Sequence, residues 1–317
     1  MNAPTLQDIQ RAAEKIKGKV IRTPLVEAWD ISREIGCKLH LKLENFQLTH
    51  AFKVRGNLNK ITSLQGKCKN GVITASTGNH GQGLALAAAM HNIPVKIVVP
   101  ECSPQTKRNA IIGYGAELIV HGSDYQSASE YAHELAQHEE RIYVHSFDDP
   151  EIMAGQGTIA LEILEDLPNV EVILAPIGGG GLIGGLLIAI KELRPDIKVI
   201  GVQTTAFPSM AESRKKGECT SVPEGKTIAD GVAVRQPGEL PVNIVIKYID
   251  DIWLVEEDLI RKAMKMLINK MKIIIEPAGA VTLAGILKHQ GELAGKIVAA
   301  VVSGGNADTS LLKEIIQ

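Results

Sequence analysis

A run of glycines directly after an apolar segment is the first feature of this chain that could do chemistry. Residues 170–177, VEVILAPI, are rich in branched apolar side chains and predict a buried strand of a parallel sheet. Four glycines follow at 178–181, and apolar residues resume at helical spacing from Leu182. A strand, a bare loop and a helix N-terminus in that order direct several N–H groups to one point, which favours phosphate binding.

The glycine run has three possible interpretations. The spacing Gly179-x-Gly181-x-x-Gly184 matches the dinucleotide-binding fingerprint. That fingerprint also needs an acidic residue about 20 positions later to bind a ribose hydroxyl. The next predicted strand ends at Val202-Gln203, where no acid stands. A cup for a smaller, mononucleotide-sized phosphate therefore fits better, and a purely structural glycine turn is the third interpretation.

Lys53 lies just inside a predicted helix N-terminus and follows the aromatic Phe52. The helix macrodipole disfavours a cation at that end, so we expect a lowered pKa for the amine. A lowered pKa is what an amine needs to attack a carbonyl and form a Schiff base. The alternative is a solvated lysine with no special role, which is common on helices.

Two polar loops at predicted strand ends complete the set. Residues 76–80, STGNH, offer hydroxyls and helix N–H groups to a carboxylate, and Asn79 could donate to a phenolic oxygen. They could equally form an ordinary capped helix start, where His80 would be structural. Ser303 precedes two glycines and could form a simple turn. Together, the phosphate cup, Schiff-base lysine, carboxylate loop and strand-end hydroxyl describe a pyridoxal-phosphate enzyme acting on an amino acid.

Alternating helices and strands must position these loops. Short strands predicted at 71–75, 95–99, 117–120 and 143–144, separated by helices, form a compact parallel sheet. A strand at 38–43 precedes this alternation, and a second alternation from about residue 152 includes strands at 170–177, 197–202, 251–255 and 296–302. Residues 203–249 are loop-rich, which suggests an insertion that contributes to function or to an interface. The prediction is an α/β protein with two open, largely parallel sheets, each flanked by helices, and a ligand between their strand carboxyl ends.

The composition of the chain limits the kinds of partner that it can be expected to bind. A formal charge of -2 provides no field for nucleic acid or an anionic membrane surface. The four cysteines, at 37, 68, 102 and 219, have no paired spacing and indicate reduced thiols. The N-terminus carries no secretory signal pattern, and no apolar run is long enough to span a bilayer. We therefore expect a cytoplasmic protein with a small-molecule partner and no zinc site.

The chain resembles the fold-type II pyridoxal-phosphate enzymes of the serine/threonine dehydratase group, over nearly its whole length. The motifs that carry the resemblance occur in the family's order: LKLEN at 41–45, AFKVRG at 51–56, STGNHGQG at 76–83, GGGG at 178–181, ADGVAV at 229–234, EPAGA at 276–280 and SGGN at 303–306. The resemblance implies the tryptophan synthase beta-like fold. We expect a large cofactor-binding domain at 1–45 and 146–317, and a small α/β domain at 46–145.

The resemblance also implies roles for single residues. Lys53 would hold pyridoxal 5'-phosphate through a Schiff base and act as the catalytic base, beside Phe52. Asn79 would lie beside the ring hydroxyl, and Ser303 would bind the pyridine nitrogen. The phosphate would lie on Gly178, Gly179, Gly180 and Gly181, and the substrate carboxylate on Ser76, Thr77, Gly78, Asn79 and His80.

Three departures from the family pattern matter. His50-Ala51 replaces the Gly-Ser that often precedes Phe-Lys, so a hydroxyl next to the lysine is missing. Thr77 stands where many threonine dehydratases have Ala and serine racemases have the Ser that donates a proton. Its hydroxyl keeps racemisation open. Gln203 and Ser209 stand where the racemases' metal site needs carboxylates, so we predict no metal there.

The expected reaction is β-elimination of water from L-threonine or L-serine, giving a 2-oxo acid and ammonia. Within enzymes, the alternatives are a serine racemase and a dehydratase of another 3-hydroxy amino acid, such as 3-hydroxyaspartate or phenylserine. Outside enzymes, the alternative is an amino-acid-sensing protein on the same fold. The family resemblance also leads us to expect a homodimer or homotetramer.

Overall fold

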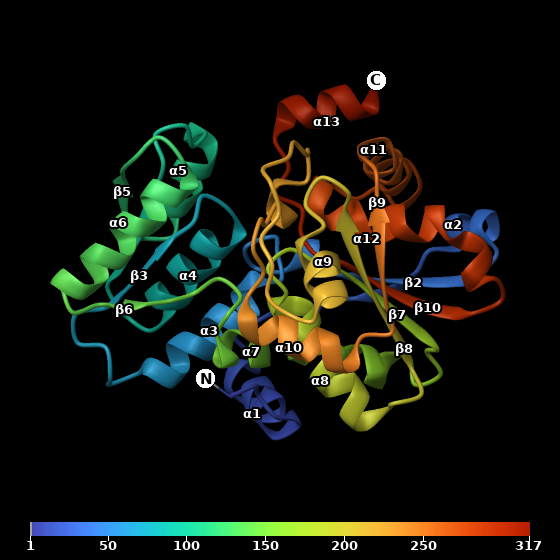
Figure 1. The fold of residues 1–317 in the computed structure, drawn as a ribbon, viewed down its shortest axis with the longest axis horizontal. Coiled ribbons are helices and arrows are strands. Elements are labelled where there is room, and N and C mark those ends of the chain that lie inside the picture. The colour runs from blue at the N-terminus through green and yellow to red at the C-terminus, as the bar shows by residue number, and fades with distance from the viewer. Residues whose placement is uncertain (1) are drawn as a thin grey trace.

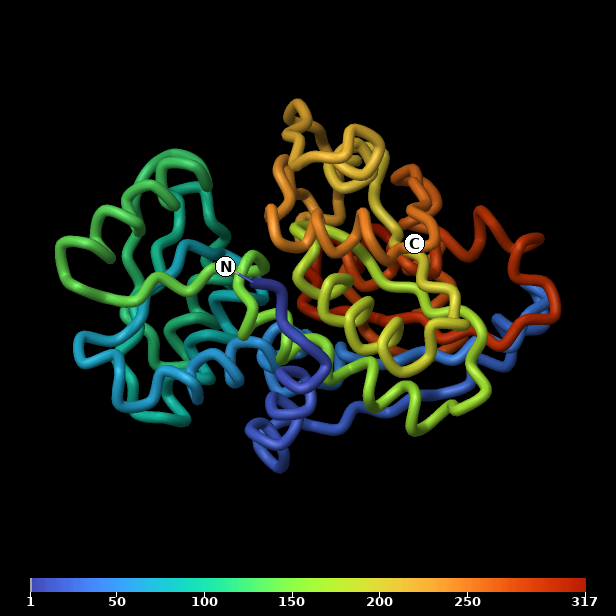
Figure 2. The backbone as a smooth tube through the Cα atoms, turned by 60° about the horizontal axis from the view of Figure 1, so that its bottom comes forward, coloured from blue at the N-terminus to red at the C-terminus, as the bar shows by residue number. Residues whose placement is uncertain are grey.

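Two β-sheets flanked by helices make up the structure, a computed structural model that describes residues 2–317 (Figure 1). The six-stranded sheet has the order β1-β2-β10-β7-β8-β9, and the four-stranded sheet has the order β5-β4-β3-β6. We call the six-stranded sheet with its helices the large lobe, and the four-stranded sheet with its helices the small lobe. Figure 2 shows the two lobes side by side, joined where the chain crosses between them.

The large lobe's sheet is parallel except at one edge, where β1 pairs with β2 in the antiparallel sense. Of its central strands, β7 is buried over its whole length and β10 from Val298 onward, as expected for continuous runs of branched apolar residues covered on both faces. The strands are β1 Leu25–Glu27, β2 Lys38–Leu43, β7 Val172–Pro176, β8 Lys198–Thr204, β9 Asp251–Val255 and β10 Ile297–Val302.

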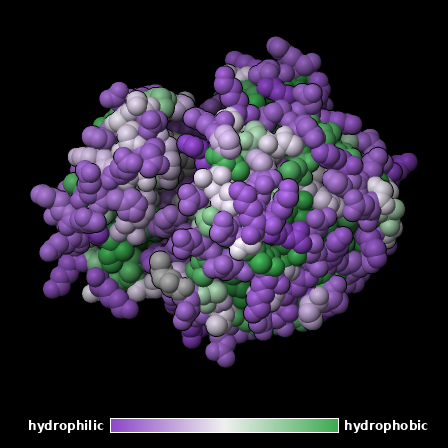
Figure 3. Space-filling model, viewed as in Figure 1, coloured by the Kyte–Doolittle hydropathy of each residue, from purple (hydrophilic) through white to green (hydrophobic). Residues whose placement is uncertain are grey.

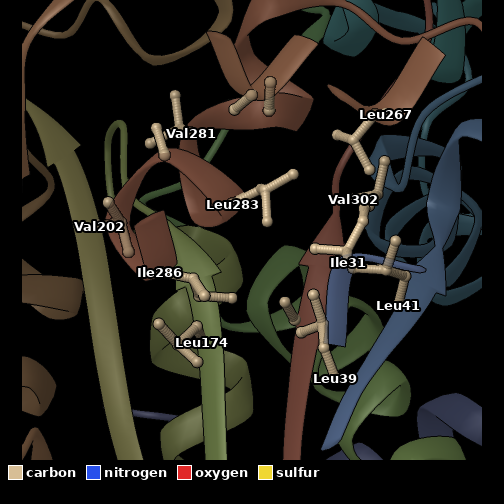
Figure 4. Packing of buried hydrophobic residues seen from close by; sticks show 14 of the residues in the cluster. Ile31, Leu39, Leu41, Leu174, Val202, Leu267, Val281, Leu283, Ile286 and Val302 are labelled. Carbon is tan, nitrogen blue, oxygen red and sulfur yellow. The ribbon is translucent and has the colours of Figure 1, made fainter. Parts of the chain in front are cut away.

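Helices cover both faces of this sheet and form two separate cores. On one face, α2, α11 and α12 pack over the strands, and Figure 4 shows Ile286 of α12 beside Leu174 of β7 in this core. On the other face, α1, α7, α8 and α10 bury the second core. The large-lobe helices are α1 Leu6–Ile16, α2 Trp29–Ile35, α7 Pro150–Asp166, α8 Gly181–Leu193, α9 Ser209–Lys216, α10 Glu239–Tyr248, α11 Glu257–Met266, α12 Pro277–Lys288 and α13 Thr309–Ile316.

The small lobe's sheet is entirely parallel, as its alternation of helices and short strands predicts. Helices α3, α4 and α5 cover one face and α6 covers the other. The strands are β3 Val72–Ala75, β4 Val95–Val99, β5 Glu117–Val120 and β6 Ile142–Tyr143. The helices are α3 Lys53–Leu64, α4 Asn79–Met90, α5 Gln105–Gly113 and α6 Tyr125–His138.

Helix α3 is held between the lobes by glycines. A Cβ on Gly155 of α7 would stand 2.7 Å from the carbonyl oxygen of Arg55, and one on Gly83 of α4 would stand 2.8 Å from Nδ2 of Asn57. Because these positions carry no side chain, α4 and α7 approach the backbone of α3 closely. The helix that begins at Lys53 is therefore clamped from both lobes.

Three parts of the fold differ from the sequence prediction. The antiparallel edge strand β1 was not expected, and residues 203–249 contain α9 and α10 where loops were expected. Helix α9 has no apolar stripe, since its sequence is SMAESRKK. In α10, Pro241 stands at the third position, within the first turn, where a missing N–H is tolerated. The third difference is at the end of α11, which continues as a π-helical turn over Leu267–Met271.

Among residues 2–317, no helix combines the length and the apolar composition that a membrane crossing requires. The face drawn in Figure 3 is mostly hydrophilic, and the surface is hollowed between the two lobes.

Candidate active site

Lys53 lies where the chain passes from the large-lobe sheet into α3. The three residues before it pair with the segment that follows β10. Ala51 forms an antiparallel bridge with Gly304, the N–H of Phe52 donates to the carbonyl of Ser303 at 3.1 Å, and the N–H of Gly305 donates to that of His50 at 2.8 Å. These bonds attach the start of α3 to the carboxyl end of β10, although more than 240 residues separate them.

The amine of Lys53 is held in the interior. Nζ donates a hydrogen bond to the carbonyl oxygen of Ser146 at 2.9 Å and lies 5.3 Å from the centroid of the Phe52 ring. Burial lowers the pKa of the amine to about 8, and the Glu276 carboxylate opposes that shift. The lowered pKa agrees with the sequence prediction, but its main cause is burial, where the prediction invoked the helix macrodipole.

The glycine run forms the loop between β7 and α8, as its position in the sequence predicts. Gly180 has φ +97°, and a Cβ there would stand 2.5 Å from Cβ of Pro241. A Cβ on Gly179 would overlap the ring of Phe147. Within residues 2–317, the N–H groups of Gly178, Gly179 and Gly180 donate to no other residue. A bare cradle with free N–H groups beside a helix N-terminus is suited to an anion such as a phosphate.

The loop at 76–80 connects β3 to α4, and its side chains have different surroundings. The Ser76 hydroxyl oxygen accepts from the N–H groups of Gly78 at 3.3 Å and Gly81 at 3.1 Å, which holds the loop in shape. Thr77 is half-buried, and its hydroxyl bonds to no other described residue. The loop therefore leaves the Thr77 hydroxyl free for a ligand.

His80 differs from its neighbours because its ring points into the small lobe. Nε2 donates to the carbonyl oxygen of Val144 at 3.1 Å, and burial, reinforced by the charge of Lys53, lowers the ring pKa to about 3. A neutral, buried ring supports the structural interpretation of His80. Because the ring is buried and its Nε2 is engaged by Val144, we expect this residue to contribute to carboxylate binding through its backbone.

Asn79 and Ser303 bring the two lobes together. The Asn79 amide, at the start of α4, donates through Nδ2 to Oε1 of Glu276 at 2.7 Å and accepts through Oδ1 from Nδ2 of Asn306 at 2.7 Å. Ser303, at the end of β10, is only 3% exposed, and its hydroxyl bonds to no other residue of 2–317. Residues that follow β3 and β10 thus meet at one place, as the sequence predicts for the carboxyl ends of the sheets.

Sequence reasoning gave no role to Glu276, Asn306 or Phe147, which all contact site residues. Glu276 and Asn306 belong to the quoted motifs EPAGA and SGGN, so the motifs located them without assigning a function. An acid directly before a proline at a helix start was the available signal for Glu276. Phe147 gave no signal, because its contact with Gly179 exists only in the folded chain.

Gln203 and Ser209 are engaged within the large lobe. Gln203 donates to the carbonyl of Phe207 at 3.2 Å and accepts from the N–H of Ala211 at 3.0 Å, and the Ser209 hydroxyl donates to the carbonyl of Val234 at 2.7 Å. Across residues 2–317, no group of three or more His, Cys, Asp or Glu side chains is arranged to hold a metal. Gln203 is also no substitute for the acid that a dinucleotide site requires.

A lysine with a depressed pKa, a bare phosphate cradle and an unbonded buried serine together fit pyridoxal phosphate. The profile of the family described as "Pyridoxal-phosphate dependent enzyme" matches residues 16–304. The chain belongs to this family of pyridoxal-phosphate-dependent enzymes. Its tryptophan synthase beta-like fold and its cofactor are those that the sequence resemblance implied.

Within the family, the chain is similar to threonine ammonia-lyases. It is 44% identical over 313 residues to the L-threonine ammonia-lyase of Thermotoga maritima, covering 98% of this chain and 78% of that protein. It is 44% identical over 318 residues to a Staphylococcus aureus "L-threonine dehydratase catabolic TdcB", covering 99% and 92%. Among solved structures, maize serine racemase superposes with a TM-score of 0.94 at 33% identity, covering 98% of this chain and 96% of that one.

Proposed function

We propose that the protein is an L-threonine ammonia-lyase that also accepts L-serine and releases a 2-oxo acid and ammonia. The 44% identity to threonine ammonia-lyases over nearly the whole chain supports this activity. The observation that carries it is the convergence of the Lys53 amine, the free glycine loop and the 76–79 loop at facing strand ends.

The binding roles follow from which groups are free. We assign the phosphate to the loop from Gly178 to Gly181, in which the N–H groups of the first three glycines are unbonded, and the ring nitrogen to the Ser303 hydroxyl. Asn79 supplies an amide N–H to the ring hydroxyl, and Phe52 lies beside the amine. Pyridoxal phosphate, when bound, supplies an aldehyde that condenses with amines and a ring that stabilises negative charge at the substrate α-carbon.

The substrate roles use the two remaining loops. The Ser76 and Thr77 hydroxyls and the N–H groups of Asn79 and His80, at the start of α4, bind the substrate carboxylate. The Lys53 amine removes the α-proton. With a pKa of about 8, the amine is partly neutral near pH 7.5, so it can accept a proton in that range. We assign a further, catalytic role as a proton donor to the Thr77 hydroxyl, which bonds to no other described residue.

Purified protein supplied with cofactor tests the activity directly. L-Threonine and L-serine are each incubated with the protein, and 2-oxo acid is measured. Product from L-threonine is expected, and no product from either amino acid with cofactor bound overturns the proposal. Lys53→Ala should abolish both product and the borohydride-reducible bond to the cofactor, whereas Lys69→Ala, at an exposed site, should change neither. A reducible bond in Lys53→Ala would refute the lysine assignment.

Serine racemisation is the second candidate activity, because Thr77 presents an unbonded hydroxyl and the fold is similar to that of maize serine racemase. A panel containing L-serine, 3-hydroxyaspartate and phenylserine, followed by chiral analysis, separates elimination from racemisation and identifies the preferred substrate. Cofactor-dependent turnover of any panel member excludes the amino-acid-sensing alternative.

Wider properties of the protein are also proposals. We infer a small domain at 46–145 and a large domain at 1–45 and 146–317, consistent with the division of the strands between the sheets. Exposed apolar side chains such as Trp29 and Ile274 support association into a homodimer or homotetramer, which light scattering would test. Four free cysteines support a cytoplasmic location. The engaged side chains of Gln203 and Ser209 support the absence of a metal beside them.

A further inference from the structure

Glu276 is a buried acid directly before α12, and its side chain does not cap that helix. It is 5% exposed, and its N–H donates to the carbonyl of Gly304 at 3.2 Å. A Cβ at Gly304 would overlap Oε1 of Glu276, so a residue without a side chain makes room for this carboxylate. The reaction assigned above uses neither residue, which leaves the buried acid without a role.

The hydrogen bonds that end at Glu276 have a fixed direction. The carbonyl of Thr49 can only accept, so the Asn306 group that contacts it at 2.9 Å is the amide nitrogen, Nδ2. Nδ2 of Asn306 also donates to Oδ1 of Asn79 at 2.7 Å. Oδ1 of Asn79 is thereby an acceptor, and its Nδ2 donates to Glu276 at 2.7 Å. Each bond sets the orientation of the next amide.

One N–H of Asn79 is left over. An asparagine amide has two N–H donors, and Glu276 takes one of them. Within residues 2–317, Nδ2 of Asn79 has no other acceptor. If Glu276 were absent, the amide could rotate about the bond to Asn306 or turn over, and the free N–H would have no fixed direction.

We propose that Glu276 is a positioning residue of the cofactor site, which holds the Asn79 amide so that its free N–H can bind the ring hydroxyl. This inference rests on the assignment of Asn79 to that hydroxyl in the proposed function. Glu276 acts through Asn79, and because the two residues belong to different lobes, it fixes the amide only while the lobes are together.

A double-mutant cycle on cofactor affinity tests the proposal. Pyridoxal phosphate is titrated into the apo forms of four full-length proteins: the parent, E276A, N79A and the double variant. We expect E276A to weaken binding about tenfold when Asn79 is present and less than about twofold when residue 79 is alanine. The same loss in both backgrounds would overturn the proposal, because Glu276 would then act independently of Asn79.

The conservative variant E276Q distinguishes positioning from bulk structure. An amide oxygen in place of Oε1 can still accept from Asn79, so E276Q should bind the cofactor within about threefold of the parent. If E276A does not fold, E276Q is compared with E276L in the same cycle, and equal affinities of these two variants would contradict the proposal. Because the titration does not depend on turnover, loss of threonine turnover with an intact cycle would count against the proposed function alone.

Discussion

Lys107 of α5 and Asp230 of the large lobe form an ion pair between the lobes, with Nζ 2.5 Å from Oδ2. The Lys107 side chain is 19% exposed and that of Asp230 is 59% exposed. Burial opposes protonation of the lysine, but Asp230, with smaller contributions from Asp308 and Glu276, raises the Lys107 pKa overall. The lysine therefore stays charged and ties the small lobe to the segment that carries the ADGVAV motif.

Breaking this pair should weaken substrate binding more than it affects folding. Lys107→Met and Asp230→Asn should each raise KM for L-threonine about two- to fivefold, because a half-exposed pair contributes roughly 0.5–1 kcal/mol. The double variant should be no worse than either single variant, and added salt should reduce the difference from the parent. KM values that multiply in the double variant would show that the two side chains act separately.

Lys53 should make the stability of the apo protein depend on pH in the alkaline range. Its folded pKa of about 8 is below the ordinary 10.5, so between these values the folded state binds fewer protons than the unfolded state. The free energy of unfolding gained from this group should therefore rise between pH 8 and pH 10.5. Denaturant unfolding at about pH 7.5 and about pH 10 should show this rise, and Lys53→Met should remove it. An unchanged rise in Lys53→Met, with Lys69→Met as the exposed control, would contradict the assignment.

Glu276 should make the free energy of unfolding fall as the pH rises, and in a more acidic range than Lys53. Burial, followed by the charge of Asp230, raises its pKa to about 7 from the ordinary 4.5, against hydrogen bonding from Asn79 and the charge of Lys107. Between these values the folded state binds more protons than the unfolded state. The contribution of Glu276 to stability should thus fall from pH 4.5 to pH 7. Unfolding of apo Glu276→Gln should lack this component, and matching pH profiles for parent and variant would refute the raised pKa.

The contact between Gly179 and Phe147 predicts a pair of compensating substitutions. Gly179→Ala places a methyl group into the Phe147 ring, so the loop or the ring must move, and cofactor affinity should fall about tenfold. Phe147→Leu in that background should restore part of the affinity. Gly113→Ala, at the end of α5 with open space around it, should have no effect in the same titration. If Phe147→Leu did not raise the cofactor affinity of Gly179→Ala, the loss would not come from the contact with the Phe147 ring.

Thr77 predicts how the two candidate activities separate. Thr77→Ala removes an unbonded hydroxyl from the 76–80 loop and should abolish any conversion of L-serine to D-serine. Elimination from L-threonine should persist, because the Lys53 amine is untouched, but its KM should rise because the carboxylate loses a hydrogen bond. Thr77→Ser keeps the hydroxyl and should retain both activities. Chiral chromatography together with a 2-oxo acid assay measures the two, and D-serine formed by Thr77→Ala would rule out this donor.

Part of the fold followed from local sequence pattern. Strands at 38–43, 95–99, 117–120 and 251–255 have the bounds that the sequence predicted, because each is a short run rich in branched apolar residues that turn or loop residues delimit. Helices α9 and α10 were missed for different reasons: α9 carries no apolar stripe, and α10 has Pro241 in its first turn, a residue that usually interrupts a helix. Strand β1 is only three residues long, too short for a periodic signal.

The sequence predicted which loops form the candidate site, but it did not predict the contacts between those loops. Lys53, Ser303 and the glycine loop each stand at an element boundary, which neighbouring residues in the chain make visible. The bond from Asn79 to Glu276 joins positions 197 residues apart, and only the docking of the two lobes creates it. For the same reason, burial as the main cause of the Lys53 pKa could not be inferred from the sequence.

The pairing of residues 50–52 with 303–305 divides the site into two parts, one on each side of the paired backbone. The amine of Lys53 and the hydroxyl of Ser303 are carried by backbone that is hydrogen-bonded together, so their separation is built into a single rigid seam. The 76–80 loop, between β3 and α4, is not part of this paired backbone. A displacement of this loop relative to the seam would therefore change the space available to the substrate carboxylate while leaving the amine in register with the end of β10. Substrate range could then be altered through the 76–80 loop while the amine and the Ser303 hydroxyl keep their separation.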